Sequence, residues 1–427
     1  MGNETNGKEY KGVKSLVGVY FVSWGFASLD RLIIAMMLPF IMPYFGLNLA
    51  QGGLIVTMMA IGYLIFVILG GAISDKVGRK KITLPMIIIF SILSCVTGFV
   101  KSIAMLFVVR TVIGGAEGAF SSSATAHMAE VAPPEKRGAY LGIYNSAFGL
   151  FGSFLAPLYA MNVASRWGWQ MACYLTIIPG IIIVIVAAIL VKESPRFVKG
   201  TNEYAEAQAA IEQNKGKVKV STLEVMKVRN VGLAIAMTMT YFVWCWSWLS
   251  FGTSFFIAQY GFSDTDSGTI MSMFGLGGFV GSLIIPRISD TLGRKTLTPI
   301  TTALGFVFTL ICVLGGFGFV GLCVTLFIAS FFTWGTLPCY MLALPTESVK
   351  PEWSASAVGL VIGLGELVGI AIAPPILGII GDATNLTVSM VIGSFGLIAV
   401  IILSFFLKET APGAIKRQEA KRLNAQA

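Results

Sequence analysis

Apolar residues gather into long runs along the chain, and short polar segments separate these runs. A bilayer core is about 30 Å thick, so a helix that spans it needs about 20 mostly apolar residues. Twelve stretches reach that length, roughly 16–43, 51–73, 82–100, 103–127, 138–163, 169–191, 230–259, 266–286, 297–316, 319–343, 355–380 and 386–407. The pattern predicts an all-α membrane protein with twelve spanning helices.

The predicted helices fall into two groups of six on either side of a polar segment. We expect an N-terminal six-helix half at 1–191 and a C-terminal six-helix half at 230–407. The segment 192–229 between them is too polar to span the membrane and should contain a short amphipathic helix. A basic tail follows at 408–427.

A short charged turn occurs twice in the chain, once in each half. The residues GAISDKVGRK at 71–80 recur 215 positions later as PRISDTLGRK at 286–295. Each copy lies between two apolar runs. The repeat predicts two pseudo-symmetric halves built on one plan.

The amount and placement of charge fix the class of protein and its orientation. Hydrophobic residues make up 56% of the chain and charged residues 12%, which excludes a soluble globule. Of the 30 Lys and Arg, two lie inside predicted helices and two in loops on one side, which leaves 26 on the other side. The positive-inside rule makes that side cytoplasmic, together with both termini. We expect a multi-pass protein of the cell membrane. Its net charge of +9 indicates that basic side chains contact anionic lipid rather than nucleic acid.

Cysteine and histidine content gives no support for a metal centre. The six Cys lie within predicted helices without a CxxC pair, and the chain has one His. We interpret the cysteines as small apolar packing residues. No constellation typical of an enzyme is visible, and we expect neither a metal nor a cofactor.

Charged side chains inside the predicted helices are the candidates for function. Asp30 and Arg31 lie near the middle of the first helix, and Arg110 and Glu117 lie in the fourth. A charge at that depth costs at least about 3 kcal/mol unless it faces protein or water. Consecutive helical residues diverge by about 100°, so Asp30 and Arg31 can serve different neighbours. Arg31 is either an anion anchor in a central cavity, where its planar fork suits a carboxylate, or half of a structural ion pair.

These features resemble the major facilitator superfamily over nearly the whole chain, through the two charged turns, the sequence RTVIGGAEG at 110–118 and the six-plus-six layout. Within it, LDR at 29–31, the glycine pattern at 46–53, GY at 62–63 and Glu117 resemble the anion:cation symporter branch. The resemblance implies alternating access, substrate contact by Arg31, and proton coupling through Asp30 and Glu117. The alternative for Glu117 is a helix brace with Arg110. The substrate would be a small organic anion, such as a sugar acid or an aromatic acid, driven by the proton gradient, and we expect a functional monomer.

Further substrate contacts are expected from three other helices. Tyr63 matches the symporter pattern, and its hydroxyl can donate to a carboxylate. Trp244 and Trp248 belong to an aromatic stripe of the seventh helix that either packs or lines the cavity. Glu366 in the eleventh helix departs from the family pattern, in which small residues are usual. It is either a second protonatable or substrate-selective site or a local pairing partner, and if it faces Arg31 the ligand also carries an amine or hydroxyls.

The charged turns predict a switch at the cytoplasmic face. In each turn an arginine follows the aspartate by four residues, and a glutamate lies at the matching end of the fourth or tenth helix. We expect these charges to latch one half against the other, because a network made in one state alone biases the equilibrium. The candidate gating residues are Asp75, Arg79, Glu130, Arg137, Asp290, Arg294 and Glu347, of which Arg137 has no counterpart in the second half.

Prolines inside three predicted helices indicate bends. Pro39 and Pro43 lie in the first helix, Pro157 in the fifth and Pro374 with Pro375 in the eleventh. Each removes a backbone donor and should bend or break its helix, which makes these helices candidate hinges.

Secondary transport of a small organic anion with protons is therefore the leading hypothesis, and three alternatives remain. A proton-coupled drug or cation antiporter is favoured by Glu366 and the aromatic stripe, but the fifth helix lacks the tight Gly-Pro pair of that class. A neutral-sugar porter is favoured by ESPR at 193–196, although Arg31 has no obvious task there. A receptor or scaffold without transport is disfavoured by the charges inside the membrane.

Overall fold

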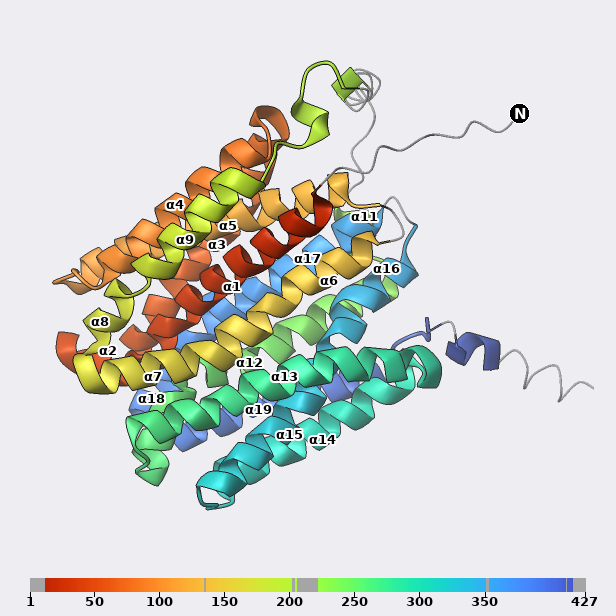
Figure 1. Ribbon diagram of the computed structural model, residues 1–427. Coiled ribbons are helices and arrows are strands. Elements are labelled where there is room, and N and C mark those ends of the chain that lie inside the picture. Colours follow the sequence, from red (N-terminus) through yellow and green to blue (C-terminus); the bar gives the residue numbers. More distant parts are fainter. Residues whose placement is uncertain are drawn as a thin grey trace, which may run out of the picture.

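The structure is a computed structural model that describes residues 12–133, 136–201, 204–205, 222–350, 353–411 and 413–417. Within these ranges the chain forms helices and turns without a strand. Twelve helical segments are long and apolar enough to cross a membrane. They lie side by side as one bundle (Figure 1). The predicted all-α architecture with twelve spans is confirmed.

Several spans are divided into two or three helical segments. The N-terminal half contains α1 (Val13–Met36), α2 (Leu38–Phe45), α3 (Leu49–Val77), α4 (Lys80–Thr97), α5 (Ile103–Val131), α6 (Arg137–Ala147), η1 (Phe148–Leu155), α7 (Ala156–Trp167), α8 (Trp169–Tyr174) and α9 (Ile177–Leu190). The segment after it contains η2 (Pro195–Phe197) and α11 (Thr222–Met226). The amphipathic helix predicted between them lies outside the described residues, apart from 204–205.

The C-terminal half repeats the plan of the first. It contains α12 (Arg229–Tyr260), α13 (Asp264–Leu292), α14 (Arg294–Leu314), α15 (Phe319–Pro338), η3 (Cys339–Ala343), α16 (Leu344–Ser348), α17 (Ser354–Glu366), η5 (Leu367–Ile372), α18 (Ala373–Ala383) and α19 (Leu386–Ser404). In Figure 1 this half runs from green to blue beside the red-to-yellow first half.

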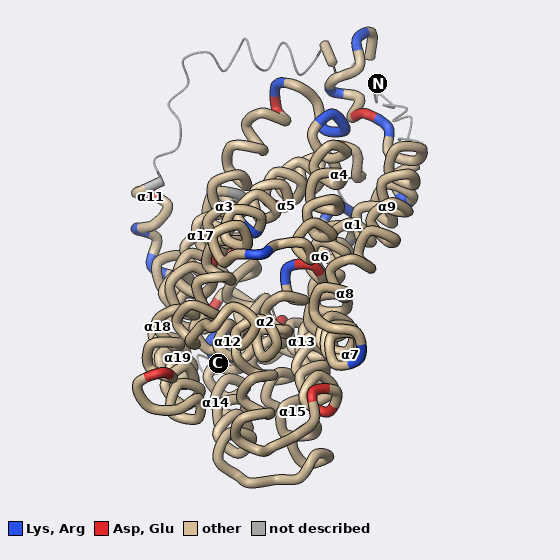
Figure 2. The backbone as a smooth tube through the Cα atoms, turned by 90° about the vertical axis from the view of Figure 1, so that its left-hand side faces the viewer, with Lys and Arg blue, Asp and Glu red and all other residues tan. Residues whose placement is uncertain are grey.

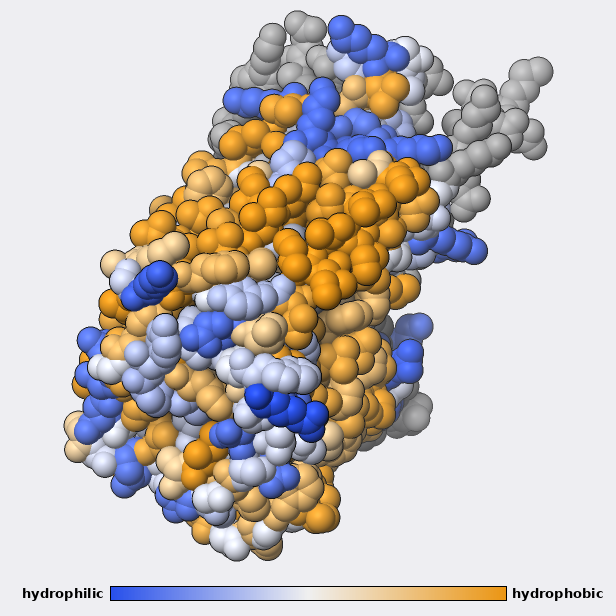
Figure 3. Space-filling model, turned by 60° about the vertical axis from the view of Figure 1, so that its left-hand side comes forward, coloured by the Kyte–Doolittle hydropathy of each residue, from blue (hydrophilic) through white to orange (hydrophobic). Residues whose placement is uncertain are grey.

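The bundle has two chemically different ends and an apolar belt. We call the end with both charged turns, 71–80 and 286–295, the turn end, and the other the far end. Lys and Arg gather at the turn end, among them Arg79, Lys80, Arg294 and Lys295, and Figure 2 draws the Lys and Arg of the chain in blue. Hydrophobic residues form a broad band across the face shown in Figure 3, and exposed side chains such as Ile68, Ile189 and Val320 suit a lipid surface.

Polar side chains fix where helices begin at the far end. The Asn48 side chain accepts from the Gln51 amide, and the Gln51 side chain accepts from the Asn48 amide, which completes a capping box at the start of α3. The side chains of Ser102, Ser263 and Asn385 cap α5, α13 and α19 in a similar way. These caps satisfy amides that a spanning helix leaves without partners at its end.

The α-helix is interrupted near the expected prolines in all three spans. The first span breaks at Met37 between α1 and α2, the fifth contains the π-helix η1 before Pro157, and the eleventh contains η5 before Pro374. The tenth span adds η3 directly after Pro338, which the sequence analysis did not anticipate. A π-helix shifts the helix register, so side chains beyond it face a new direction.

The two halves pack closely through glycines on facing helices. A side chain at Gly53 of α3 would collide with the backbone of Pro374 in α18, and one at Gly275 of α13 would collide with the backbone of Ser153 in η1. In contrast, Gly142 of α6, toward the turn end, has open space where its side chain would lie. Small residues therefore set how closely the halves approach.

Hydrogen bonds between the halves also concentrate toward the far end. Asp382, at the end of α18, accepts from the backbone amides of Leu49 and Ala50, both at 2.9 Å. Its carboxylate thus caps α3 of the other half, where a negative charge is favoured. These two hydrogen bonds and the close glycine contacts hold the halves together at the far end, so the conformation is closed there.

We predict that Asp382→Ala weakens closure at the far end. Loss of a helix cap costs about 1 kcal/mol, about fivefold in the closed-to-open equilibrium. A cysteine at Val56, which lines the internal cavity, should then react faster with a membrane-impermeant thiol reagent added on the far side, in a background without native cysteines.

Asp264→Ala is the matched control, because Asp264 lies in the first turn of α13 at the same end and has no hydrogen bond to the other half among the described residues. An unchanged labelling rate in Asp382→Ala would contradict the assignment.

Candidate functional site

A buried ion pair joins the first and fourth spans inside the N-terminal half. Arg31 of α1 donates from Nε and Nη2 to Oε2 of Glu117 in α5, at 3.1 and 3.0 Å. Arg31 is 7% exposed and Glu117 is fully buried. Each side chain neutralises a charge that would be costly alone at this depth.

A second ion pair lies beside the first. Arg110 Nη1 lies 3.4 Å from Asp30 Oδ2, and Arg110 Nη2 donates to the Arg31 carbonyl at 3.1 Å. Asp30 and Arg31 thus have different partners, as their divergence on the helix allowed. Glu117 is held by Arg31, so the brace considered between Glu117 and Arg110 does not form.

Aromatic rings enclose the Arg31 guanidinium. Its Cζ lies 4.1 Å from the centroid of the Tyr63 ring and 5.4 Å from that of Trp24. The Tyr63 hydroxyl donates to Ser121 Oγ at 3.4 Å. Cation–π contact and the ion pair together orient the guanidinium.

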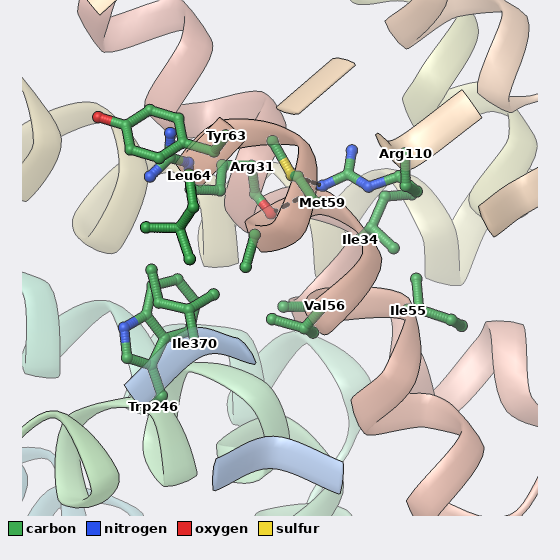
Figure 4. A pocket seen from close by; sticks show the side chains of 12 residues that line it. Arg31, Ile34, Ile55, Val56, Met59, Tyr63, Leu64, Arg110, Trp246 and Ile370 are labelled. Atoms are coloured by element: carbon green, nitrogen blue, oxygen red, sulfur yellow. Dashed lines mark hydrogen bonds between the residues drawn. The ribbon is translucent and has the colours of Figure 1, made fainter. Parts of the chain in front are cut away.

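A small cavity lies between the halves beside this cluster (Figure 4). It offers about 10 Å³ to the centre of a water molecule, roughly the space of one water. Its wall consists of Arg31, Ile34, Ala35, Ile55, Val56, Met59, Ala60, Tyr63, Leu64, Arg110, Trp246 and Ile370. Trp246 and Ile370 come from the C-terminal half, so the cavity needs both halves.

The structure brings Glu366 toward this cluster from the opposite half. Glu366 ends α17, four residues before the cavity residue Ile370. It is partly buried, and it lies close enough to Arg31 and Tyr63 to act on both electrostatically. The structure therefore groups Asp30, Arg31, Tyr63, Glu117 and Glu366 around one region.

The two predicted tryptophans do not line the cavity. Trp244 and Trp248 are fully buried and pack on Phe274 of α13, with ring centroids 5.4 and 6.3 Å apart. The stripe thus fills the core of the C-terminal half in this conformation. The cavity-lining aromatic of α12 is Trp246, which the sequence analysis missed because it lies outside the periodic stripe.

At the first charged turn, Arg79 lies at the centre of a network. Its Nη2 donates to Asp75 at 2.5 Å and to Glu130 at 2.6 Å, and Arg196 lies 3.2 Å from the same Glu130 oxygen. Burial opposes the charge on Arg79, but its hydrogen bonds to Glu130 and Asp75 outweigh this and raise the pKa of Arg79 above its usual value. Arg79 is therefore charged at any physiological pH.

The second turn forms the matching network around Arg294. Arg294 Nη2 donates to Asp290 at 2.9 Å and to Glu347 at 2.6 Å. The expected latch residues are thus brought together in two groups. In this conformation the described contacts of each group stay within its own half or the segment after it, so the expected latch between halves is not formed here. Arg137 is exposed at the start of α6 and takes part in neither group among the described contacts.

One repeated member of these networks was not predicted from the sequence. Glu193 accepts from the amides of Arg79 and Lys80, and Glu409 accepts from those of Arg294 and Lys295. Gly78 and Gly293 make room for these carboxylates with φ of 119° and 108°. The signal was present, because KES at 192–194 recurs as KET at 408–410.

Comparison with protein families and curated proteins gives consistent matches. The family model described as Major Facilitator Superfamily matches residues 20–368. A hexuronate transporter of Bacillus subtilis is 26% identical over 63% of this chain and 62% of its own. A probable sulfoacetate transporter of Cupriavidus necator is 33% identical over 37% and 36%. A glucose transporter of Staphylococcus epidermidis is 31% identical over 42% and 40%, so each match covers less than two thirds of the relative.

Among solved structures, a bacterial homologue of the human lysosomal transporter Spinster, in an inward-facing and occupied conformation, matches with a TM-score of 0.72. The match covers 92% of this chain and 95% of that one at 16% identity. At this identity it shows the fold alone.

We predict that Asp30 and Arg110 stabilise the protein as a pair. Arg110→Gln leaves a buried carboxylate unpaired, which should cost about 3–5 kcal/mol. Adding Asp30→Asn to that variant should restore part of the loss, because no isolated charge then remains. Thermal unfolding of the purified protein in detergent measures the cycle.

Lys101→Gln is the control, since Lys101 is exposed in a loop at the far end. Strictly additive losses in Asp30→Asn and Arg110→Gln would show that the two side chains do not act as a pair.

Proposed function

Because the chain belongs to the Major Facilitator Superfamily, we propose that it carries a small organic anion together with protons by alternating access. The family and the matched relatives are membrane transporters and not enzymes. The chain is therefore a membrane transporter. The proposal concerns the substrate class and the driving ion.

The observation that carries the proposal is a buried arginine, paired with a carboxylate, at the wall of a cavity between the halves. The two parallel donors of Arg31 already hold a carboxyl oxygen of Glu117. A substrate carboxylate or sulfonate offers the same acceptor geometry and can take that place. Two matched relatives, the hexuronate and sulfoacetate transporters, carry anions by name.

In this proposal Glu117 couples the proton to the substrate. Ionised Glu117 occupies Arg31 and keeps it from other anions. Protonation removes the charge that holds the pair, so Arg31 becomes free for the substrate. Oε1 of Glu117 has no hydrogen-bond partner among the described residues, which leaves one oxygen for the proton. Binding of the proton and of the substrate thus favour each other, because the substrate anion replaces ionised Glu117 as the partner of Arg31.

Asp30 is the second proton site in the proposal. It lies next to Arg31 in α1 and is held by Arg110 from α5, the helix that also carries Glu117. A change of charge on Asp30 releases Arg110, whose Nη2 also holds the carbonyl of Arg31. The protonation of Asp30 can therefore alter the position of the substrate anchor.

Alternating access then moves this site from one side of the membrane to the other. The inter-half bond of Asp382 must break for the far end to open. The ion-pair groups around Arg79 and Arg294 keep each turn intact while the halves move. In the proposal these two groups contact each other across the halves in the conformation that is closed at the turn end. A ligand shifts this equilibrium by its differential affinity for the two conformations.

A neutral-sugar porter is the second candidate function. The glucose transporter of Staphylococcus epidermidis is 31% identical over the matched segment, which favours it. In that case Arg31 and Glu117 would form a permanent brace, and their substitution would affect stability rather than ligand choice.

We predict that Arg31→Gln and Glu117→Gln lose different steps of transport. Arg31→Gln removes the charge and the fork, so binding of an anion should weaken by about 2–5 kcal/mol, at least about 30-fold. Glu117→Gln mimics the protonated acid, so it should still bind and exchange substrate but fail to accumulate it with a proton gradient. Proteoliposomes with radiolabelled galacturonate and sulfoacetate measure both steps.

Arg166→Gln, which removes an exposed arginine at the end of α7, is the control and should behave as the parent. Accumulation by Glu117→Gln equal to that of the parent would place proton coupling elsewhere. Normal anion binding by Arg31→Gln would exclude Arg31 as the anchor.

A further inference from the structure

Glu366 is a carboxylate that the proposed anion mechanism does not use. It lies in the eleventh span, in the C-terminal half, whereas Arg31 and Glu117 belong to the N-terminal half. It is partly buried, and it forms no hydrogen bond or ion pair with the described residues. A carboxylate at this depth is expensive unless a functional partner compensates for it.

The neighbours of Glu366 place it between the contact with its own half and the cavity. Gly365 and Gly369 lie against Phe242 of α12, which is where this span packs on its own half. One turn before Glu366, Gly363 has open space where its side chain would lie. One turn after it, Ile370 lines the cavity of Arg31. Glu366 directly precedes η5 and lies about one turn from both Gly363 and Ile370, which places it at the edge of the cavity side.

Arg31, the proposed substrate anchor, lies in the wall of the cavity that Ile370 borders from the other half. Glu366 lies within electrostatic range of Arg31, yet the two side chains form no ion pair among the described residues. Glu366 also acts on the Tyr63 hydroxyl, which lies against Arg31. The region therefore has a cationic pole on one half and an anionic pole on the other, separated by more than a direct contact.

A π-helix begins directly after Glu366. The residues after Glu366 form η5, from Leu367 to Ile372, and Thr57 of α3 donates to the Ala371 carbonyl in it at 2.9 Å. This segment is thus tied to the other half at one end and carries Glu366 at its other end. A π-helix is frequent at functional sites, because its register shift re-aims side chains.

We infer that the substrate is bipolar: its carboxylate or sulfonate binds Arg31, and a hydrogen-bond-donating group, an ammonium or a hydroxyl, binds Glu366. The inference rests on the proposed anion function and narrows its substrate class. It excludes simple fatty acids and other anions with a purely apolar body. Because the two poles lie on different halves, a ligand that bridges them draws the halves together.

The test compares ligands that differ in the donor alone. The probes are butyrate, 4-hydroxybutyrate and 4-aminobutyrate, the corresponding five- and six-carbon acids, and galacturonate. Binding to the purified full chain is measured by competition against one radiolabelled member. The parent should bind an acid that carries a hydroxyl or ammonium donor at least tenfold more tightly than the matched unsubstituted acid. Glu366→Gln should lose that preference and should still bind the unsubstituted acid with the affinity of the parent.

Comparison of the hydroxy acids with the amino acids of the same length identifies which donor the site prefers. Glu366→Asp keeps the charge but shortens the side chain, so it should shift the preference toward the acid one carbon longer; this variant keeps the test valid if Glu366→Gln does not fold. Glu224→Gln removes an exposed carboxylate of α11 and should leave the preference unchanged.

Two results would overturn the inference while the anion function stands: a parent that binds substituted and unsubstituted acids equally, or a preference that persists in Glu366→Gln. A parent that binds none of the acids, or an Arg31→Gln variant that binds all of them normally, would overturn the proposed function and this inference with it.

Discussion

The need to neutralise charge inside an apolar bundle governs the interior of this protein. Arg31, Arg110, Asp30 and Glu117 lie at a depth where each charge alone would cost several kcal/mol, and they form two ion pairs between α1 and α5. Such pairs stabilise little by themselves, but removal of one partner is costly. This makes the region responsive to anything that supplies or removes one charge, as the proposed proton coupling requires.

The same requirement shapes the turn end, where it produces stability rather than responsiveness. In each half a buried arginine is surrounded by carboxylates, and a glutamate after the sixth span caps the helix that follows the turn. The arrangement is repeated around Arg79 and Arg294, and in the proposed alternating access each half moves as a body with its own turn network intact. The halves meet through glycines and a few hydrogen bonds toward the far end, so their relative position is the adjustable feature.

Sequence alone predicted the twelve spans, the proline bends and the residues of both charged turns, because these follow from length, periodicity and local covalent constraints. It also allowed Asp30 and Arg31 to have different partners, because consecutive helical residues diverge. It did not select Trp246 over Trp244 and Trp248, since the side of a helix that faces a cavity depends on how α12 packs against α13. Nor did it find the cap by Asp382, because a contact between residues more than 300 positions apart depends on how the two halves pack together.

The central claim is that a substrate anion and ionised Glu117 compete for Arg31. Titration of the purified, weakly buffered protein with galacturonate, with a pH indicator present, tests this most directly. The account predicts that binding takes up about one proton more per ligand in the parent than in Glu117→Gln, since in the parent Glu117 is displaced from Arg31 and becomes protonated. Binding without proton uptake in the parent, or the same uptake in Glu117→Gln, would contradict it.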